Sequence, residues 1–116
     1  MPTLYVETST LLRVALEGDL VLKQRLIEAD RSMTSALTRV EADRAFRRAL
    51  SAKRLQAGTA QERRRWVEDF LSNCDEIVID ASVLSRARQD FPVEPVRTLD
   101  ALHLASLLGW NQADGR

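Results

Sequence analysis

Hydrophobic and polar positions change their spacing several times along the chain, and these changes divide it into short strands and helices. The run 3–7 is apolar, β-branched and aromatic, which predicts a buried strand. A helix from Thr10 to about residue 17 is expected next, with Gly18 as its stop. Apolar positions within 20–29 predict a second helix. The first unit is therefore a strand followed by two helices.

The same unit is expected twice more. Two further strands are predicted, at 32–36 and 76–79, and four helices, one running from the second strand to about 56 and the others at 60–72, 81–89 and 99–108. Helix N-caps are expected at hydroxyl side chains, namely Thr34, Ser35 or Thr38, then Thr59 and Thr98. Gly109 is expected to end the last helix. This alternation predicts an α/β domain with a parallel sheet.

Composition sets the class of protein. The chain has 116 residues, of which 45% are hydrophobic and 29% charged, so we expect one globular domain over 1–116. No apolar run is long enough to predict a membrane helix, and the N-terminus lacks the pattern of a signal peptide. The single cysteine, Cys74, excludes an internal disulfide and a cysteine-based zinc site. We therefore expect a cytoplasmic protein without a membrane partner.

Charge is distributed unevenly along the chain. Basic and acidic residues number 17 each, so the formal net charge is zero. Among the charged residues of the stretch 44–65, however, all are basic except Glu62. Arg44 and Arg48 follow Glu41 at helical spacing and are candidates for contacting a phosphate. A solvated helix face with ion pairs explains the same pattern.

Three acids hold notable positions. Glu7 ends the first predicted strand, Glu41 lies about one turn into the helix after the second strand, and Asp100 lies in the first turn of the last helix. Ligands of parallel sheets gather beyond the carboxyl ends of the strands, and all three acids are expected at that edge. Taken singly, Glu41 and Asp100 are also explained as helix-terminal charges. Glu7 is expected inside the fold, where an acid needs a partner.

Carboxylates that converge repel one another unless a cation neutralises them. An all-oxygen site favours Mg²⁺ or Mn²⁺, and a metal held in this way can activate water against a phosphodiester. Thr8, Ser9 and Thr98 either hydrogen-bond the acids and the metal-bound waters or serve only as helix caps. His103 is expected to be a structural, hydrogen-bonded histidine rather than a metal ligand.

Three segments resemble the PIN domain, and within it the VapC-type toxins of bacterial toxin–antitoxin pairs. They are YVETSTLL, MTSALTRVEADRA and RTLDALHLASLL, and the resemblance extends over 3–108. It implies a three-layer α/β/α sandwich and an endoribonuclease that depends on Mg²⁺ or Mn²⁺. It also implies a homodimer and a cognate antitoxin. The family's first three acids correspond to Glu7, Glu41 and Asp100, which would be both the catalytic residues and the metal ligands.

The chain departs from the family pattern in two ways. The first acid is normally Asp, and here Glu7 moves the carboxylate by about 1.5 Å, the length of one bond. The family also continues into further strands and a fourth acid, for which Asp114 is not expected to substitute. The domain is thus expected to be incomplete at its C-terminus, with the first strand as an exposed edge that a second copy or a partner covers.

Two other functions fit the sequence. One is a PIN-like module that binds an antitoxin or RNA without cleaving it, because the fourth acid is absent. The other is a helical structural protein in which the acids have no joint role.

Overall fold

Three short parallel strands form the centre of the computed structural model, which describes residues 3–113. The strands are β1 (Thr3–Tyr5), β2 (Arg31–Ser35) and β3 (Asp75–Ile77), in the spatial order β1-β2-β3. Tyr5 lies opposite Met33, and Ser35 lies opposite Ile77. Asp114 lies outside the described residues.

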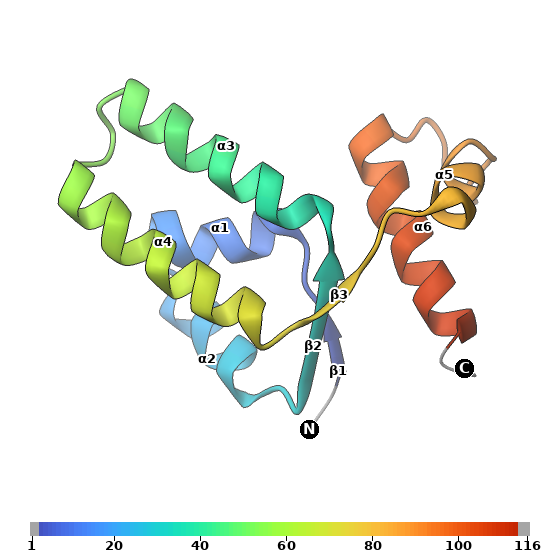
Figure 1. The fold of residues 1–116 in the computed structure, drawn as a ribbon, viewed down its shortest axis with the longest axis horizontal. Coiled ribbons are helices and arrows are strands. Elements are labelled where there is room, and N and C mark those ends of the chain that lie inside the picture. Colours follow the sequence, from blue (N-terminus) through green and yellow to red (C-terminus); the bar gives the residue numbers. More distant parts are fainter. Residues whose placement is uncertain (1–2, 114–116) are drawn as a thin grey trace.

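Six helices cover the sheet on both sides. They are α1 (Thr8–Glu17), α2 (Leu20–Glu28), α3 (Leu37–Ser51), α4 (Ala57–Ser72), α5 (Ala81–Ala87) and α6 (Thr98–Ala113). Helices α1 to α4 lie on one side of the sheet, and α5 and α6 lie on the other (Figure 1). The α/β class, the parallel sheet and the three-layer arrangement expected from the sequence are confirmed. Within 3–113, no helix is both long and apolar enough to cross a membrane.

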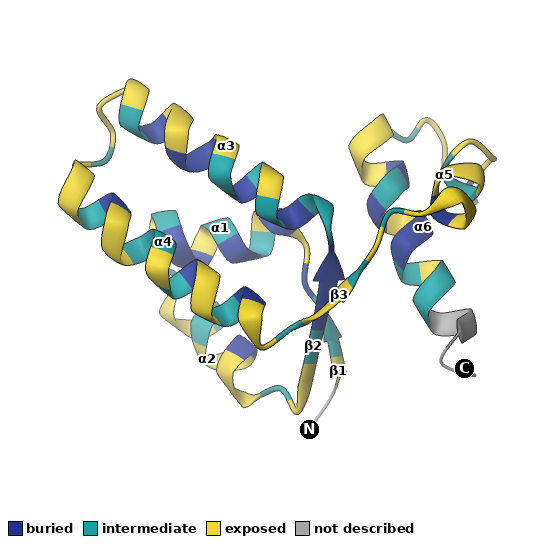
Figure 2. Cartoon of the chain, in the orientation of Figure 1, coloured by how far each residue is buried: buried dark blue, intermediate teal, exposed yellow. Residues whose placement is uncertain are grey.

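The main hydrophobic core lies between β1, β2 and the first four helices. Leu11 and Phe46 are almost completely buried there, at 0% and 1% exposure, and burial follows the inner stripe of α1 and α3 (Figure 2). Burial of apolar side chains such as these is the main stabilising contribution to a small domain. The sequence pattern located these helices correctly because each has one apolar face.

Two helix boundaries differ from the prediction around the turn between α3 and α4. Helix α3 ends at Ser51, about five residues earlier than expected, because the chain reverses at Lys53, which has a left-handed φ of 57°. The Arg54 amide then donates to the carbonyl of Ala49, which closes the turn. Helix α4 begins at Ala57, before the expected cap Thr59, because Gln56 already has the extended backbone of a cap.

Other ends are set by residues that the pattern did not single out. Asp19 and Asp80 cap α2 and α5 by accepting from backbone amides, each at 3.0 Å. Helix α6 includes Thr98 and continues through Gly109 to Ala113, so Gly109 does not end it. A glycine inside a helix costs only about 1 kcal/mol, which packing of the helix can offset.

β1 is an edge strand. Among the described strands it pairs with β2 alone, which agrees with the expected exposed edge. On the outer side of α2, Leu20 and Val21 are 75% and 72% exposed. The sheet edge and α2 are thus two surfaces on which apolar or unpaired groups face outward.

Candidate functional site

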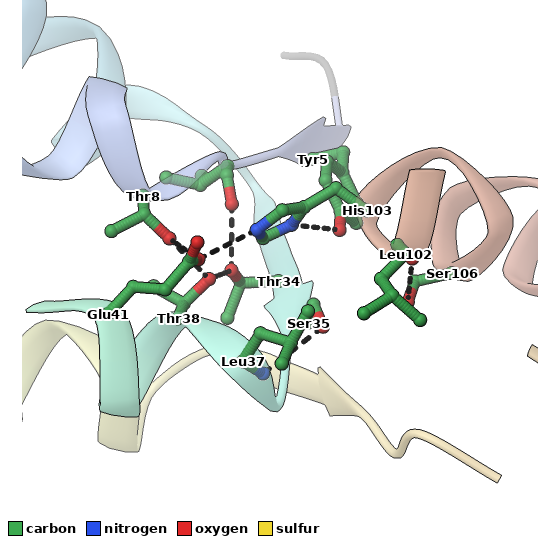
Figure 3. A network of polar contacts seen from close by, with 11 residues as sticks. Tyr5, Thr8, Thr34, Ser35, Leu37, Thr38, Glu41, Leu102, His103 and Ser106 are labelled. Carbon is green, nitrogen blue, oxygen red and sulfur yellow. Dashed lines mark hydrogen bonds and ion pairs between the residues drawn. The ribbon is translucent and has the colours of Figure 1, made fainter. Parts of the chain in front are cut away.

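The carboxyl ends of β1 and β2 lead directly into α1 and α3. Glu7 and Thr8 therefore begin α1, and Thr38 and Glu41 lie in the first turns of α3. From the opposite layer, α6 brings His103 to the same place (Figure 3). Three elements distant in the sequence thus supply one polar cluster at the end of the sheet where ligands of parallel sheets bind.

Glu41 lies at the centre of this cluster. Its side chain is 22% exposed, and its Oε1 accepts from the Thr8 hydroxyl at 2.5 Å and lies 2.8 Å from His103 Nε2. A partly buried carboxylate needs such donors because its charge is poorly solvated. These two contacts fix one oxygen of Glu41 between α1 and α6.

His103 connects Glu41 with the first strand. Its ring is buried, with 6% of the residue exposed, and its Nδ1 lies 3.1 Å from the Tyr5 hydroxyl. With the phenol donating to Nδ1, a neutral imidazole has its proton on Nε2 and donates it to Glu41. The prediction of a structural, hydrogen-bonded histidine is confirmed, and the partner it holds is a candidate catalytic acid.

Tyr5 remains a protonated donor over the physiological range. Burial raises the pKa of its hydroxyl well above the ordinary value, and the negative charges of Glu7 and then Glu41 raise it further. The phenol therefore keeps the proton that its contact with His103 uses. Glu7 and Glu41 thus both contribute negative potential at Tyr5.

Buried threonines form a chain of hydrogen bonds next to Glu41. Thr34 donates to the carbonyl of Val6 at 2.7 Å, so its 2.7 Å contact with Thr38 has Thr38 as donor. Thr38 Oγ1 in turn lies 3.2 Å from Thr8 Oγ1. This chain of hydroxyls connects α1 and α3 with β2 and with Val6, the residue after β1. The backbone around Glu41 is therefore fixed by side-chain hydrogen bonds as well as by packing.

A groove of about 460 Å³ opens beside this cluster. It lies between α1 and α3, with the start of α6 at one side, and has an apolar part and a polar part. Its lining residues are Thr8, Ser9, Leu12, Leu37, Val40, Glu41, Arg44, Arg48 and Leu99. The groove thus joins the Glu41 carboxylate to the two arginines that the sequence singled out for phosphate contact.

The other two candidate acids are placed differently. Glu7 is exposed and is the N-cap residue of α1, so the expectation that it lies inside the fold is wrong: the chain turns outward one residue after the buried Val6. Asp100 is exposed in the first turn of α6. Among the residues that the structure describes, no three His, Cys, Asp or Glu side chains lie close enough together to hold a metal ion.

This arrangement does not fit a preformed divalent-metal site. Glu41 Oε1 already accepts from Thr8 and His103, and within residues 3–113 Asp100 does not form a metal-binding cluster with Glu41 and Glu7. The joint role of Glu7, Glu41 and Asp100 as metal ligands and catalytic residues stays a prediction. Both of the contacts from Thr8 and His103 are made to Oε1, so an ion would bind Glu41 through its second carboxylate oxygen or by displacing these donors.

The residues expected to assist the acids fall into two groups. Thr8 contacts Glu41 directly, and Ser9 is exposed at the rim of the same groove. Thr98 is exposed at the start of α6, where no hydrogen bond of its side chain to an acid is found within 3–113. Of the three residues, Thr8 is therefore the one that the structure connects to a candidate acid.

Cys74 is not a candidate nucleophile. Burial raises the pKa of its thiol to about 11, so it is almost entirely protonated near neutral pH, and only a thiolate attacks efficiently. It lies at the start of β3, at the opposite end of the sheet from Glu41.

No model of a known protein family matches the chain. Over 107 residues it is 36% identical to Ribonuclease VapC35 from two strains of Mycobacterium tuberculosis, an alignment that covers 89% of this chain and 71% of the relative. The chain belongs to the VapC family. The resemblance to VapC-type toxins that three sequence segments indicated is thereby confirmed, and the Glu41 cluster and its groove are the candidate site of a VapC protein.

Sequence reasoning missed part of this VapC site. The sequence pattern predicts Tyr5 only as a strand residue, and Thr34 and Thr38 only as helix caps. In the structure all three belong to the hydrogen-bond network around Glu41 and His103. One signal was available for His103, because it follows Asp100 by three residues on one helix and so points to the same side. Nothing in the local sequence pairs Tyr5 with His103, since the two lie 98 positions apart.

Proposed function

We propose that this VapC-family chain is an endoribonuclease and acts as the toxin of a toxin–antitoxin pair. The observation that supports it most is the position of Glu41, a carboxylate fixed at the carboxyl edge of the sheet in a groove shared with two arginines. Its relatives are named ribonucleases. RNA phosphates suit this groove because guanidinium groups bind phosphate oxygens with two parallel hydrogen bonds.

In this proposal the groove binds and orients the RNA backbone. Arg44 and Arg48 lie one turn apart on α3, so they can contact one phosphate or two neighbouring ones. Their positive charge stabilises the negative charge that grows on a phosphodiester during hydrolysis. The apolar side chains Leu12 and Leu99, across the groove, offer a surface for a base or ribose.

We also propose that the activity depends on Mg²⁺ or Mn²⁺ held by Glu7, Glu41 and Asp100. Hard divalent cations prefer carboxylate oxygens, and such an ion would supply an activated water and neutralise phosphate charge. Glu7 and Asp100 are exposed, and neither forms an ion pair within residues 3–113, so their carboxylates are accessible.

An Asp100→Asn variant tests this proposal. We expect it to lose RNA cleavage by a factor of about 100 or more, and to lose Mn²⁺ binding in calorimetry, because the amide keeps the shape of the side chain and removes its charge. Stability should fall by less than about 1 kcal/mol, since Asp100 contributes only a favourable charge at a helix N-terminus.

The matched control is Asp90→Asn, which changes an exposed acid in the loop after α5. It should cleave and bind Mn²⁺ as the wild-type chain does. Equal cleavage by the wild-type chain and the Asp100 variant would point to a contaminating nuclease and would remove Asp100 from the site.

A second candidate function is a VapC-like module that binds RNA or an antitoxin without cleavage. Two observations favour it. Glu41 Oε1 is held by Thr8 and His103, and within residues 3–113 no three carboxylates, histidines or cysteines lie close enough to hold a metal ion. RNA binding with no cleavage at any Mn²⁺ concentration would select this function over the ribonuclease.

We further propose that the chain is a cytoplasmic homodimer that binds a cognate antitoxin. The exposed edge of β1 and the outward apolar residues of α2 support a protein partner, because both are surfaces that association would cover. We expect light scattering after gel filtration to give twice the mass of one chain. A stable monomer at micromolar concentration would contradict the dimer.

A further inference from the structure

Helix α3 continues past the candidate site as a row of exposed cations. From residue 44 to residue 61 the sequence has no Asp or Glu. Its basic residues, which we call the basic strip, are Arg44, Arg47, Arg48, Lys53 and Arg54. All five are exposed. The strip begins in the groove beside Glu41, where Arg44 and Arg48 lie, and ends at the turn between α3 and α4.

The strip is not neutralised by neighbouring acids. Two other arginines nearby are paired: Arg39 with Glu68 and Glu76, and Arg64 with Asp43. For the strip residues, no ion pair or side-chain hydrogen bond is found within residues 3–113. A solvated face stabilised by ion pairs, the alternative that the sequence left open, therefore does not describe this part of α3. Five exposed like charges along one stretch of chain create a positive potential that favours the binding of a polyanion.

Lys53, at the end of the strip, also supports the binding of an anion there. It has a left-handed φ of 57°, a conformation that favours glycine and disfavours residues with a Cβ atom. Its amide donates to the carbonyl of Leu50 in the turn that ends α3. The chain thus has a cation at a position where glycine would relax the backbone, at the point of the helix pair α3–α4 that projects furthest from the sheet (Figure 1).

We infer that the basic strip binds the backbone of an RNA strand and extends the candidate site away from the sheet. This inference rests on the proposed ribonuclease function and adds to it a second contact region for the substrate. Ten residues of helix separate Glu41 from Ser51, or about 15 Å at the rise of an α-helix. That length corresponds to about four or five nucleotides of a stacked strand. RNA fits better than an acidic protein because the strip is continuous with the groove that contains the candidate carboxylate.

The test measures binding of a fluorescently labelled single-stranded RNA by anisotropy, with EDTA present so that no cleavage occurs. The variant is Arg47→Gln/Arg54→Gln, which leaves the groove arginines intact. Two lost phosphate contacts should weaken binding about 25-fold at 0.1 M salt and lower the slope of log Kd against log salt by about 1.4. The control is Arg25→Gln/Arg88→Gln, which removes the same charge from α2 and the end of α5.

Lys53→Gly separates binding from folding. The variant should melt at a higher temperature than the wild-type chain, because glycine adopts the left-handed φ without strain. It should nevertheless bind RNA about 5-fold more weakly, the effect of one lost phosphate contact at 0.1 M salt. A loss of affinity that accompanies a gain in stability cannot come from misfolding.

Each outcome decides between the inference and its alternatives. If the strip variants bind RNA as tightly as the control does, and cleavage still depends on Glu41, the strip inference is wrong and the ribonuclease proposal stands. If the wild-type chain neither binds nor cleaves RNA, both are wrong. Displacement of the RNA by poly-L-glutamate at equal charge concentration would identify an acidic protein as the better ligand and would overturn the inference.

Discussion

Replacing Glu41 with Gln is expected to reduce RNA cleavage by a factor of about 100 to 10,000 while the fold is retained. The amide oxygen of Gln can still accept from Thr8 and His103, so the two contacts that fix this side chain are preserved. The negative charge is lost, and with it the ability to hold a cation or accept a proton. We expect the free energy of unfolding, measured in urea, to change by less than about 1 kcal/mol.

Glu17→Gln is the matched control for this substitution. Glu17 is an exposed acid at the C-terminal end of α1, away from the groove that begins at Thr8. Its variant should cleave RNA at the wild-type rate. Wild-type cleavage by the Glu41→Gln variant would exclude Glu41 from the active site, and with it the argument that the polar cluster is the site.

Replacing His103 with Ala is expected to lower the free energy of unfolding by about 2–4 kcal/mol and the cleavage rate by about 10- to 100-fold. The substitution removes one partner of the Tyr5 hydroxyl, which keeps its contact with Ser106. It leaves Glu41 Oε1 with the Thr8 hydroxyl alone among the donors within residues 3–113. It also opens a void beside α6, because only 6% of the residue is exposed. Urea denaturation and single-turnover cleavage measure the two effects separately.

His103→Gln distinguishes positioning from simple loss of packing. The Gln amide can donate to Glu41 as His103 Nε2 does, although it cannot reach Tyr5 at the same time. We expect this variant to recover most of the cleavage rate and only part of the stability. If both variants lose cleavage only in proportion to their unfolded fraction, His103 has a structural role alone.

The fold could be predicted from the sequence because its signals are local. The first strand follows a short apolar run, and the helices of the core have one apolar face, as in α1 with Leu11 and Val14 buried. Boundaries were less accurate where backbone geometry decided them. The left-handed turn at Lys53 ended α3 early, although Lys carries no signal for such a turn. Gly109 carries a stop signal, but α6 continues through it.

The site could be predicted only in part, for a physical reason. Strand order places Glu7 and Glu41 at one edge of the sheet, and helical spacing places Arg44 and Arg48 beside Glu41. Side-chain orientation does not follow from such rules. Glu7 is exposed and its side chain makes no capping hydrogen bond, whereas Glu41 turns inward because Thr8 and a histidine from the far layer offer it donors. Pairings between layers depend on the folded structure as a whole.

The position of helix α6 offers a way in which the activity of such a protein could be inhibited. It contains both Asp100 and His103, which are three residues apart and therefore move together. A shift of this helix relative to the sheet would change the position of one candidate acid and remove the support of another in the same motion. An inhibitor would thus need only to displace one helix, without covering any carboxylate, to disable the whole constellation.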